Sequence, residues 1–405
     1  MNTKQEIHLL IFHEKWRKHL AHSVFFATFA IVIIVNKLYL EMEEEILPTK
    51  KVVVACDSYK GCLSSKNVNE TIADALRQES KKCLGCHFDI VTLQMSDGGE
   101  GMLDAFIAAK GGERVKVHVH DPLMRWMEAV YGIGKDGVAV IEIAQAVGLA
   151  LVEPEQRNPM KATSWGVGEL VMDAYRRGVR EFIIGLGGSA TSDCGIGMLR
   201  AMGEDWKKIR EECHFRIASD VINPLLGPQG AAKVFAPQKG ATEEMVEQIE
   251  YKAIKFAELS AKHFGYDRSK VPGAGAAGGL GYAFLQYFNA ELRSGAEVLL
   301  EIVNFDRVIA DADIVITGEG CSDEQTLMGK LPLHILQHTQ KSERKPDVYL
   351  LSGRVVNSQA FECVGFKGVV GSTPVDMPLQ KAMLPKVAKA NIAQAVKELC
   401  LEDIC

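Results

Sequence analysis

The chain has 405 residues, 47% of them hydrophobic, which is enough for two domains that each bury a core. A formal net charge of −6 excludes a broad electrostatic attraction to nucleic acid. The ten cysteines are scattered, and the C-x-x-C pair of Cys83 and Cys86 has no second ligand pair nearby, which argues against a structural zinc site.

Residues 1–48 form an N-terminal extension that differs from the rest of the sequence. Its apolar segment at 20–35 follows three basic residues and is slightly shorter than the ~20 residues of a spanning helix. Met42 offers a second start just ahead of the first strand, so we expect residues 1–41 to be a start-site artefact or a dispensable extension. The free cysteines favour a reducing compartment, so a cytoplasmic protein is expected, with membrane anchoring through residues 20–40 as the alternative.

A strand, a polar turn and a helix follow one another twice in the next part of the sequence. The apolar run KVVVAC at 51–56 is typical of a buried parallel strand, and a polar turn and a helical pattern come after it. Residues 88–95 predict a second strand, which is followed by the turn at 96–101 and a helix at 102–109. This order is that of a doubly wound sheet.

The pattern changes in the middle of the chain and returns near its end. Alternating strands are predicted between 114 and 151, and the strand–helix order resumes with apolar runs at 312–317, 347–351 and 368–371. We therefore expect an α/β protein of two domains. Residues 50–113 and 290–405 form a Rossmann-like parallel-sheet domain, and residues 114–289 form a second α/β domain inserted into it.

Six polar, glycine-bearing segments carry the candidate chemistry. In open α/β sheets ligands bind outside the carboxyl ends of the strands, where several of these segments are expected. Glycine lets backbone N–H groups approach a phosphate or carboxylate, and a helix N-terminus favours negative charge. The segments are residues 57–61, 96–101, 185–193, 220–224 together with 237–240, 272–279, and 317–330.

Two stretches formally match the dinucleotide fingerprint G-x-G-x-x-G. The match in 272–279 follows Pro272 and has no clear strand before it, and the match at 132–137 lies between two strands and predicts a hairpin turn. A dinucleotide-dependent oxidoreductase remains as a rival class. It would require a strand leading into one of these motifs within a βαβ unit.

The last segment gathers groups suited to a metal-bound nucleotide. Glu319 and Asp323 are candidate ligands for Mg²⁺, which takes one or two carboxylates when it is bound to nucleotide phosphates. Lys330 is placed to reach a phosphate oxygen. The phosphate-loop motif G-x-x-x-x-G-K-[ST] is absent, because Leu331 follows Gly329 and Lys330.

Taken in order, these segments closely resemble the class I bacterial glycerate kinases. The matching stretches cover residues 51 to about 371, nearly the whole chain apart from its N-terminal segment. They are DSYKG, SDGGEG, HDPLMR, RNPMKATSWGVGEL, GLGGSATSDCG, DVINPLLGPQGAA, FAPQKG, VPGAGAAGGLG, ITGEG and DEQTLMGK.

The resemblance implies that the chain is an ATP-dependent kinase that uses Mg²⁺ and converts D-glycerate to a phosphoglycerate, with 2-phosphoglycerate favoured. Phosphoryl transfer depends mostly on alignment and charge neutralisation. We expect Lys60, Lys239 and Lys330 to neutralise the phosphate and the substrate carboxylate. Asp193 is the expected base that orients and deprotonates the glycerate hydroxyl, with Asp97 as the second candidate.

Further residues are expected to bind substrate or nucleotide. Backbone amides at Gly187, Gly188 and 275–279 are expected to hold anions. The complete set of expected binding residues is Asp57, Ser58, Gly98, Gly99, Glu100, Gly187, Gly188, Ser189, Thr191, Asp220, Asn223, Gln238, Gly275, Gly278, Gly279, Thr326 and Lys330.

The sequence departs from the family pattern at two places. Between Met202 and Asp220 the family usually has a longer segment, so part of the inserted domain is expected to be missing or replaced. Cys321 stands where the family typically has arginine, which removes a guanidinium that binds carboxylate or phosphate in a bidentate manner. The alternative function is therefore a catalytically impaired, kinase-like protein that binds glycerate or nucleotide.

Overall fold

The structure is a computed structural model that describes residues 33–35, 48–82, 87–96, 98–99, 101–400 and 404. The chain divides into two compact units, Met1–Thr49 with Cys83–His87 and Lys50–Lys82 with Phe88–Cys405. The candidate catalytic residue Asp97 and the candidate binding residue Glu100 lie outside the described residues, as does most of the apolar segment at 20–35. No helix in the described ranges is both long and apolar enough to cross a membrane.

The first sheet has five strands in the order β13-β11-β9-β1-β2, and the pairs between β13, β11, β9 and β1 are parallel. The apolar runs of the sequence form these strands, which confirms the predicted strand–turn–helix order. Their bounds are β1 Thr49–Cys56, β2 His87–Thr92, β9 Ile314–Gly318, β11 Asp347–Ser352 and β13 Gly368–Gly371.

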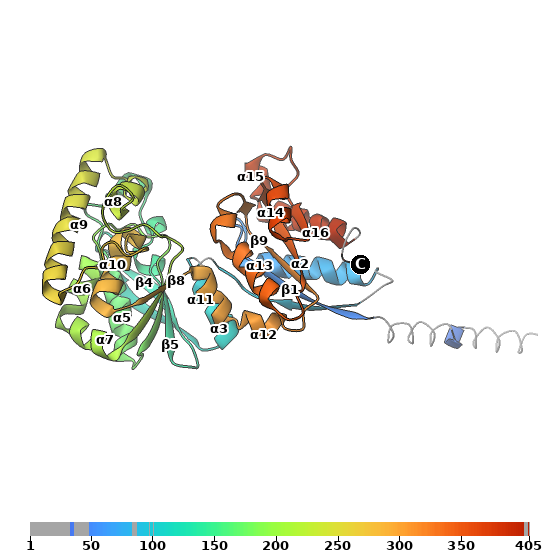
Figure 1. Cartoon of the computed structure of the whole chain (residues 1–405), viewed down its shortest axis with the longest axis horizontal. Helices are drawn as coiled ribbons and strands as arrows, with labels where there is room; N and C mark the ends of the chain where they lie inside the picture. Colours follow the sequence, from blue (N-terminus) through green and yellow to red (C-terminus); the bar gives the residue numbers. More distant parts are fainter. Residues whose placement is uncertain are drawn as a thin grey trace, which may run out of the picture. The chain divides into compact units, whose positions relative to one another are not determined.

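Strand β1 is buried on both faces because its alternate side chains enter two different cores. Val53 and Ala55 lie in one core, and Val52, Val54 and Cys56 lie in the other. Helices α2 (Ser65–Ser80) and α16 (Pro385–Leu399) contact each other over the second core (Figure 1). A strand covered on both sides needs a continuous apolar sequence, which KVVVAC provides.

Helices α3 (Met102–Lys110), α11 (Gly295–Ile302), α12 (Phe305–Ile309) and α13 (Leu331–Lys341) pack into the core that contains Val53 and Ala55. Of these helices, α13 contacts β9 and β11, whereas α3 and α11 contact strands of the second sheet. Their buried side chains include Phe106, Leu299 and Ile335. Helix α14 (Ser358–Val364) adds Phe361 to the same core. The short helix α15 spans Leu379–Ala382, and a two-stranded parallel sheet joins β10 (Cys321–Ser322) to β12 (Arg354–Val355).

The second sheet has six strands in the order β3-β4-β5-β6-β7-β8. Strands β3, β4 and β5 are antiparallel neighbours, and β5 to β8 are parallel. Gly134 and Gly137 form the turn between β4 and β5, which confirms the predicted hairpin. The bounds are β3 Glu113–His120, β4 Trp126–Ile133, β5 Val138–Glu142, β6 Glu181–Gly185, β7 His214–Ala218 and β8 Glu291–Arg293.

The stretch after Met202, which the family resemblance predicts to be shortened, contributes to this sheet. It contains α7 (Trp206–Glu212) and β7, which pairs with β6 on one side and β8 on the other. The remaining helices are α4 Ala144–Val147, α5 Trp165–Arg176, α6 Ile196–Met202, α8 Ala231–Phe235, α9 Glu243–Phe264 and α10 Ala276–Phe288.

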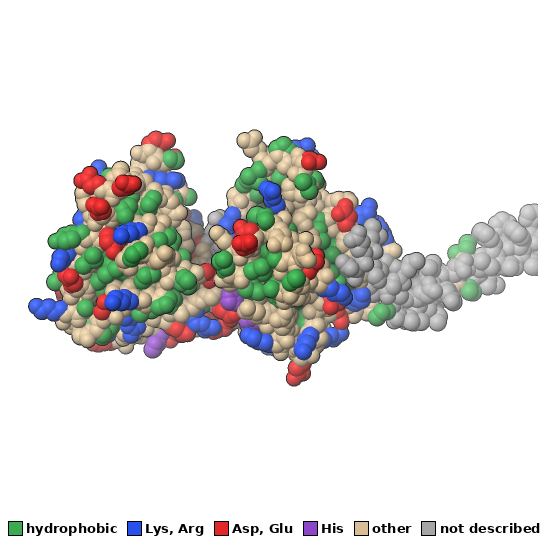
Figure 2. Space-filling view, turned by 45° about the horizontal axis from the view of Figure 1, so that its top comes forward, with side chains coloured by type: hydrophobic (Ala, Val, Ile, Leu, Met, Phe, Trp, Pro, Cys, Tyr) green, Lys and Arg blue, Asp and Glu red, His purple; other side chains and the backbone are tan. Residues whose placement is uncertain are grey.

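The strands of the first sheet come from 49–92 and 314–371, and those of the second come from 113–293. Strand β8 lies beyond residue 289, where the inserted domain was expected to end. The domain boundaries remain a prediction. Figure 2 shows positive and negative side chains interspersed over the face in view, as expected for a modest net charge.

Candidate active site

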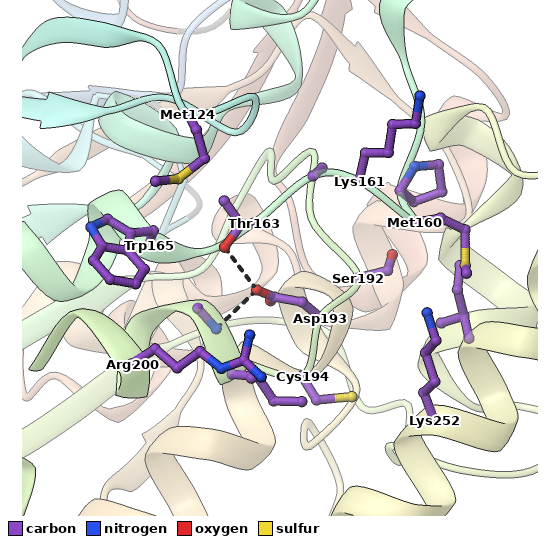
Figure 3. A pocket seen from close by; sticks show the side chains of 15 residues that line it. Met124, Met160, Lys161, Thr163, Trp165, Ser192, Asp193, Cys194, Arg200 and Lys252 are labelled. Carbon is purple, nitrogen blue, oxygen red and sulfur yellow. Dashed lines mark hydrogen bonds between the residues drawn. The ribbon is translucent and has the colours of Figure 1, made fainter. Parts of the chain in front are cut away.

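Asp193 lies in the loop between β6 and α6, and hydrogen bonds from the start of α5 and from α6 hold its carboxylate. Its Oδ2 accepts from the backbone N–H of Ser164 at 2.8 Å, from Ser164 Oγ at 2.9 Å and from the N–H of Gly197 at 3.1 Å. Thr163 Oγ1 is a more distant donor at 3.4 Å (Figure 3). Oδ1 receives only the N–H of Gly195, at 3.2 Å. The carboxylate is therefore fixed in place, and Oδ1 keeps most of its capacity to accept hydrogen bonds.

Lys239 is a buried cation beside this loop. Lys239 is the last residue of the short helical turn at 237–239, and it is 3% exposed. Nζ donates to Ser189 Oγ at 2.9 Å and to the carbonyl of Thr191 at 2.6 Å. Burial lowers the pKa of Lys239 to about 7, although the negative charge of Asp193 opposes this shift. The Lys239 amine therefore gains or loses its proton near neutral pH.

Two buried hydroxyls in the same loop have no hydrogen-bond partner among the described residues. They are Thr191 Oγ1 and Ser192 Oγ. Unpaired buried hydroxyls are rare because each has lost its hydrogen bonds to water. A ligand that supplies acceptor or donor atoms would remove this cost.

The glycine segment before α10 packs against the loop that carries Asp193. The N–H of Cys194 donates to the carbonyl of Gly278, and a Cβ on Gly278 would collide with the carbonyl oxygen of Thr191. Gly278 also has a φ of +66°, which glycine adopts at no steric cost. The N–H of Gly275 donates to the carbonyl of Asn223. The carbonyl of Gly278 and the N–H of Gly275 are thus used in contacts between loops in this structure.

A cavity of about 440 Å³ opens beside Asp193. Figure 3 shows Met124 and Trp165 on one side of Asp193, and Ser192, Lys161 and Lys252 on the other. Lys60 and Glu319 are not among its lining residues, which are Met124, Pro159, Met160, Lys161, Ala162, Thr163, Trp165, Ser192, Asp193, Cys194, Ile196, Gly197, Arg200, Ile249 and Lys252.

A second group of polar residues follows β9 in the other sheet. Glu319 Oε1 accepts from Thr326 Oγ1 at 2.6 Å and from Ser322 Oγ at 3.3 Å. The ammonium of Lys330 lies 3.5 Å from Glu319 Oε2 and 4.0 Å from Asp323 Oδ1. The structure therefore brings together the two predicted metal ligands, Thr326 and the predicted phosphate-binding lysine.

The loop that contains Asp57, Ser58 and Lys60 lies against the start of this group. The N–H of Asp57 donates to the carbonyl of Gly318 at 2.9 Å. A Cβ on Gly320 would lie 3.6 Å from the backbone nitrogen of Lys60. Because β1 and β9 are parallel neighbours, their carboxyl ends meet at one edge of the sheet.

A third group joins the turn at 98–99 to the loops of the six-stranded sheet. A Cβ on Gly187 would lie 2.8 Å from the Cα of Gly99, and one on Gly98 would lie 2.5 Å from the Cα of Gly295. Asp220 Oδ1 accepts from the N–H of Gly295 at 2.9 Å and from Ser294 Oγ at 2.8 Å. These loops therefore pack backbone against backbone.

Two histidines on α13 connect the second and third groups. His334 Nδ1 lies 2.7 Å from Glu297 Oε1, and its Nε2 lies 3.4 Å from Ser294 Oγ. His338 lies 3.2 Å from Glu297 Oε2 on the next turn. These hydrogen bonds lower the pKa of Glu297, although its burial acts in the opposite direction and is the largest single influence. The sequence did not predict this network, because its members are far apart in the chain.

Three other candidate binding residues, Asn223, Gln238 and Gly188, make contacts separate from the three groups described above. Asn223 Nδ2 donates to the carbonyl of Gln229, and the side chain of Gln238 is exposed. The loop carbonyl of Gly188 accepts from the N–H of Leu149. These contacts leave the ligand-binding role expected of the three residues as a prediction.

Glu319 and Asp323 are oxygen donors of the kind that Mg²⁺ prefers, so their chemistry fits this ion. Lys330 already neutralises part of their charge. Within the described residues, no three His, Cys, Asp or Glu side chains are grouped to hold a metal ion. An ion at this position would thus need further ligands from water and from nucleotide phosphates.

Sequence reasoning also missed the side chains that surround Asp193. Thr163, Ser164 and Trp165 lie in the stretch RNPMKATSWGVGEL, which carried part of the family resemblance without a role for its residues. Arg200 is one turn further along α6 from Gly197, on the face of that helix that lines the cavity. Helical spacing from Gly197, at the predicted helix start after Asp193, was the available signal for Arg200.

Comparison with known proteins gives consistent matches along the chain. The model of the glycerate kinase family matches residues 52–208 and 204–402. Glycerate 2-kinase of Escherichia coli K12 is 38% identical over 318 residues, which is 72% of this chain and 82% of that protein. Glycerate kinase of Halalkalibacterium halodurans is 35% identical over 377 residues, which is 84% of this chain and 97% of that protein.

A solved structure shares the fold as well. The crystal structure of a protein assigned as glycerate kinase 2 from Salmonella typhimurium LT2 aligns with a TM-score of 0.74 at 35% identity. The alignment covers 87% of this chain and 98% of that chain. The two segments matched by the family model overlap at residues 204–208, within the stretch that the family resemblance predicts to be shortened.

Proposed function

The chain belongs to the glycerate kinase family, and we propose that it transfers the γ-phosphate of ATP to D-glycerate, preferentially at the 2-hydroxyl. The observation that carries this proposal is the family match across both sheets, together with 38% identity to a protein named glycerate 2-kinase. The rigidly held Asp193 and the buried Lys239 beside it support the proposal from the geometry.

Asp193 is proposed as the base that orients and deprotonates the acceptor hydroxyl. Its Oδ1 has a single backbone donor, so it can accept the hydroxyl proton while Oδ2 anchors the side chain. Asp97 remains the second candidate. Lys239 is proposed to attract a carboxylate or phosphate when it is protonated, because an anion restores the charge that burial disfavours.

Lys60 and Lys330 are proposed to neutralise the remaining phosphate charge. Glu319 and Asp323 would hold Mg²⁺, which supplies charge neutralisation at the phosphate oxygens when it is bound. The Oγ1 of Thr326 donates to Glu319 and therefore holds the orientation of this carboxylate. The other expected binding residues, including Asp57, keep their proposed roles at the loops described above.

The proposed reaction is tested with purified full-length protein, ATP, Mg²⁺ and D-glycerate. Release of ADP, followed by a coupled assay, should depend on glycerate, and phosphorus NMR should show the phosphate on the 2-hydroxyl. A product phosphorylated at the 3-hydroxyl would overturn the proposed position. Binding of glycerate or ATP without ADP release would favour the alternative of a catalytically impaired binding protein.

Besides the stretch after Met202 that is predicted to be shortened, the exposed Cys321 is the second departure from the family pattern that supports this alternative. Strand β10 pairs with β12 so that Cys321 lies directly opposite Arg354. Partial burial raises the pKa of the Cys321 thiol, and the positive charge of Arg354 acts in the opposite direction. A guanidinium on the neighbouring strand is therefore the nearest counterpart of the one that the family resemblance implies at position 321. We propose that Arg354 serves the site in its place.

The substitution Arg354→Met is expected to lower kcat/KM by about 10- to 100-fold, the loss typical of one contact with a charged group. Adding Cys321→Arg to this variant should restore most of the lost activity, because the new guanidinium is one strand away. The measurement is steady-state kinetics of both variants. An Arg354→Met protein with full activity, or a double variant without recovery, would contradict this role.

A further inference from the structure

We infer that the cavity beside Asp193 binds the nucleoside triphosphate, an assignment that rests on the proposed kinase function and names the substrate of this cavity. Its volume of about 440 Å³ is within the range of roughly 300–1,000 Å³ found for cofactor-sized ligands. A three-carbon acid alone would leave most of this space empty. The size therefore favours the larger of the two substrates.

The cations around this cavity form no ion pair with any acidic side chain that the structure describes. Lys161, Arg200 and Lys252 are exposed and line it, and among the described residues none of them has a carboxylate within 4 Å. By contrast, Lys255 lies one turn further along α9 and forms an ion pair with Glu258 at 2.8 Å. Three unpaired cations at one cavity fit a polyanion such as a triphosphate better than a single carboxylate.

The cavity also presents an unsatisfied hydroxyl. Ser192 is 7% exposed, it lines the cavity, and its Oγ has no hydrogen-bond partner among the described residues. A buried hydroxyl without a partner is costly to the folded protein. A phosphate oxygen would accept its hydrogen bond, so this side chain points to an oxygen-rich ligand.

The opposite side of the cavity is apolar and suits the base of the nucleotide. Trp165 and Met124 lie there, across Asp193 from Lys252 (Figure 3). Trp165 Nε1 donates to Glu169 Oε1 at 3.0 Å, which fixes the orientation of the ring. A flat aromatic ring with a methionine beside it offers a stacking surface for a purine. The cavity thus combines an apolar surface with cations and an unsatisfied hydroxyl.

Direct binding of ATP to full-length protein without glycerate tests the assignment, because this readout does not require turnover. Lys252→Gln is expected to raise the Kd for ATP at least tenfold in calorimetry, and to change the KM for glycerate less than twofold. Lys262→Gln, which alters another exposed lysine on α9 outside the cavity lining, is the matched control and should leave the Kd unchanged.

Ser192→Ala separates ligand binding from folding. The hydroxyl has no partner among the described residues, so its removal should leave the melting temperature unchanged or raise it. The Kd for ATP should rise by about three- to tenfold, the loss expected for one hydrogen bond.

Three outcomes distinguish this inference from the proposed function. An unchanged Kd for ATP in both variants overturns the cavity assignment, whether or not turnover remains. A rise in the KM for glycerate with normal ATP binding also overturns it and assigns the cavity to the acid. A Lys252-dependent Kd for ATP in a protein without glycerate turnover supports the cavity assignment while the proposed reaction fails.

Discussion

Replacing Lys239 with methionine is expected to lower kcat/KM for glycerate by about 10- to 100-fold, because one charge-assisted contact with an anionic substrate is lost. Methionine has a similar length, so the change removes the ammonium while filling the same space. The hydrogen bonds to Ser189 and to the carbonyl of Thr191 are also lost. Steady-state kinetics measures the effect.

The same substitution should remove a pH dependence near neutrality. Burial holds the pKa of Lys239 at about 7 in the protein without ligand. Below pH 7 the ammonium is present and attracts an anionic substrate, and above pH 7 it is lost. Substrate affinity should therefore fall with rising pH by up to about tenfold per unit, and the Lys239→Met protein should lack this slope.

The unfolding free energy should respond in the opposite direction. In the unfolded chain the lysine keeps its usual pKa of 10.5, so between pH 7 and 10.5 the unfolded state binds more protons than the folded state. The contribution of this group to stability therefore rises with pH across that window, by up to about 1.4 kcal/mol per unit. Urea unfolding below and within the window should show this slope in wild type and its loss in Lys239→Met.

Lys233→Met is the control for these measurements, because Lys233 is exposed on the adjacent helix α8. It should leave the kinetics and both pH dependences unchanged. Equal pH slopes in wild type and Lys239→Met would show that Lys239 does not titrate near neutrality.

Asp193→Asn is expected to lower kcat by about 10²- to 10⁴-fold, the usual loss when an aligned base is removed. Asparagine retains the shape of the side chain and one oxygen for the donors at Ser164 and Gly197. The fold should therefore survive, while the charge that accepts the hydroxyl proton is gone. Single-turnover kinetics with saturating ATP and glycerate measures the chemical step.

Asp193 also accepts hydrogen bonds from the N–H groups of Gly195 and Gly197 at the start of α6. A purely structural role of this side chain therefore has to be distinguished from a role in the chemical step. The KM values and the Kd for ATP should change little in Asp193→Asn if the residue acts in the chemical step. Asp205→Asn, at a partly exposed acid shortly after the same helix, is the control and should be fully active. A folded Asp193→Asn protein with kcat within threefold of wild type would eliminate Asp193 as the base.

The sequence was sufficient to predict the parallel strands and the turns after them. A run such as KVVVAC is apolar at nearly every position because both faces of β1 are covered. The glycine and carboxylate segments then had to lie at the carboxyl ends of these strands, and Glu319, Asp323, Thr326 and Lys330 do lie together there. Local pattern and strand order determine these features.

Other features depend on contacts between distant segments, which periodicity does not show. The bond between Ser164 and Asp193 and the contact of His334 with Glu297 join residues about 30 to 40 positions apart. The unpaired hydroxyl of Ser192 is visible only when every neighbour is in place. From sequence, the glycines at 275–279 predict backbone amides that bind an anion. The structure gives another reason for a glycine at 278, because its backbone packs closely against Thr191 and Cys194.

The pairing of β1 with β9 has a consequence for synthesis on the ribosome. Thr317 Oγ1 donates to the carbonyl of Ala55, 262 positions earlier. At roughly 5–20 residues per second, β1 waits for about 13–50 s before its partner emerges. During that time all strands of the six-stranded sheet leave the ribosome, while the apolar β1 keeps the edge that faces β9 unpaired. Nascent chains are therefore most prone to aggregate in this interval, and a chaperone that shields residues 51–56 should raise the yield of folded protein.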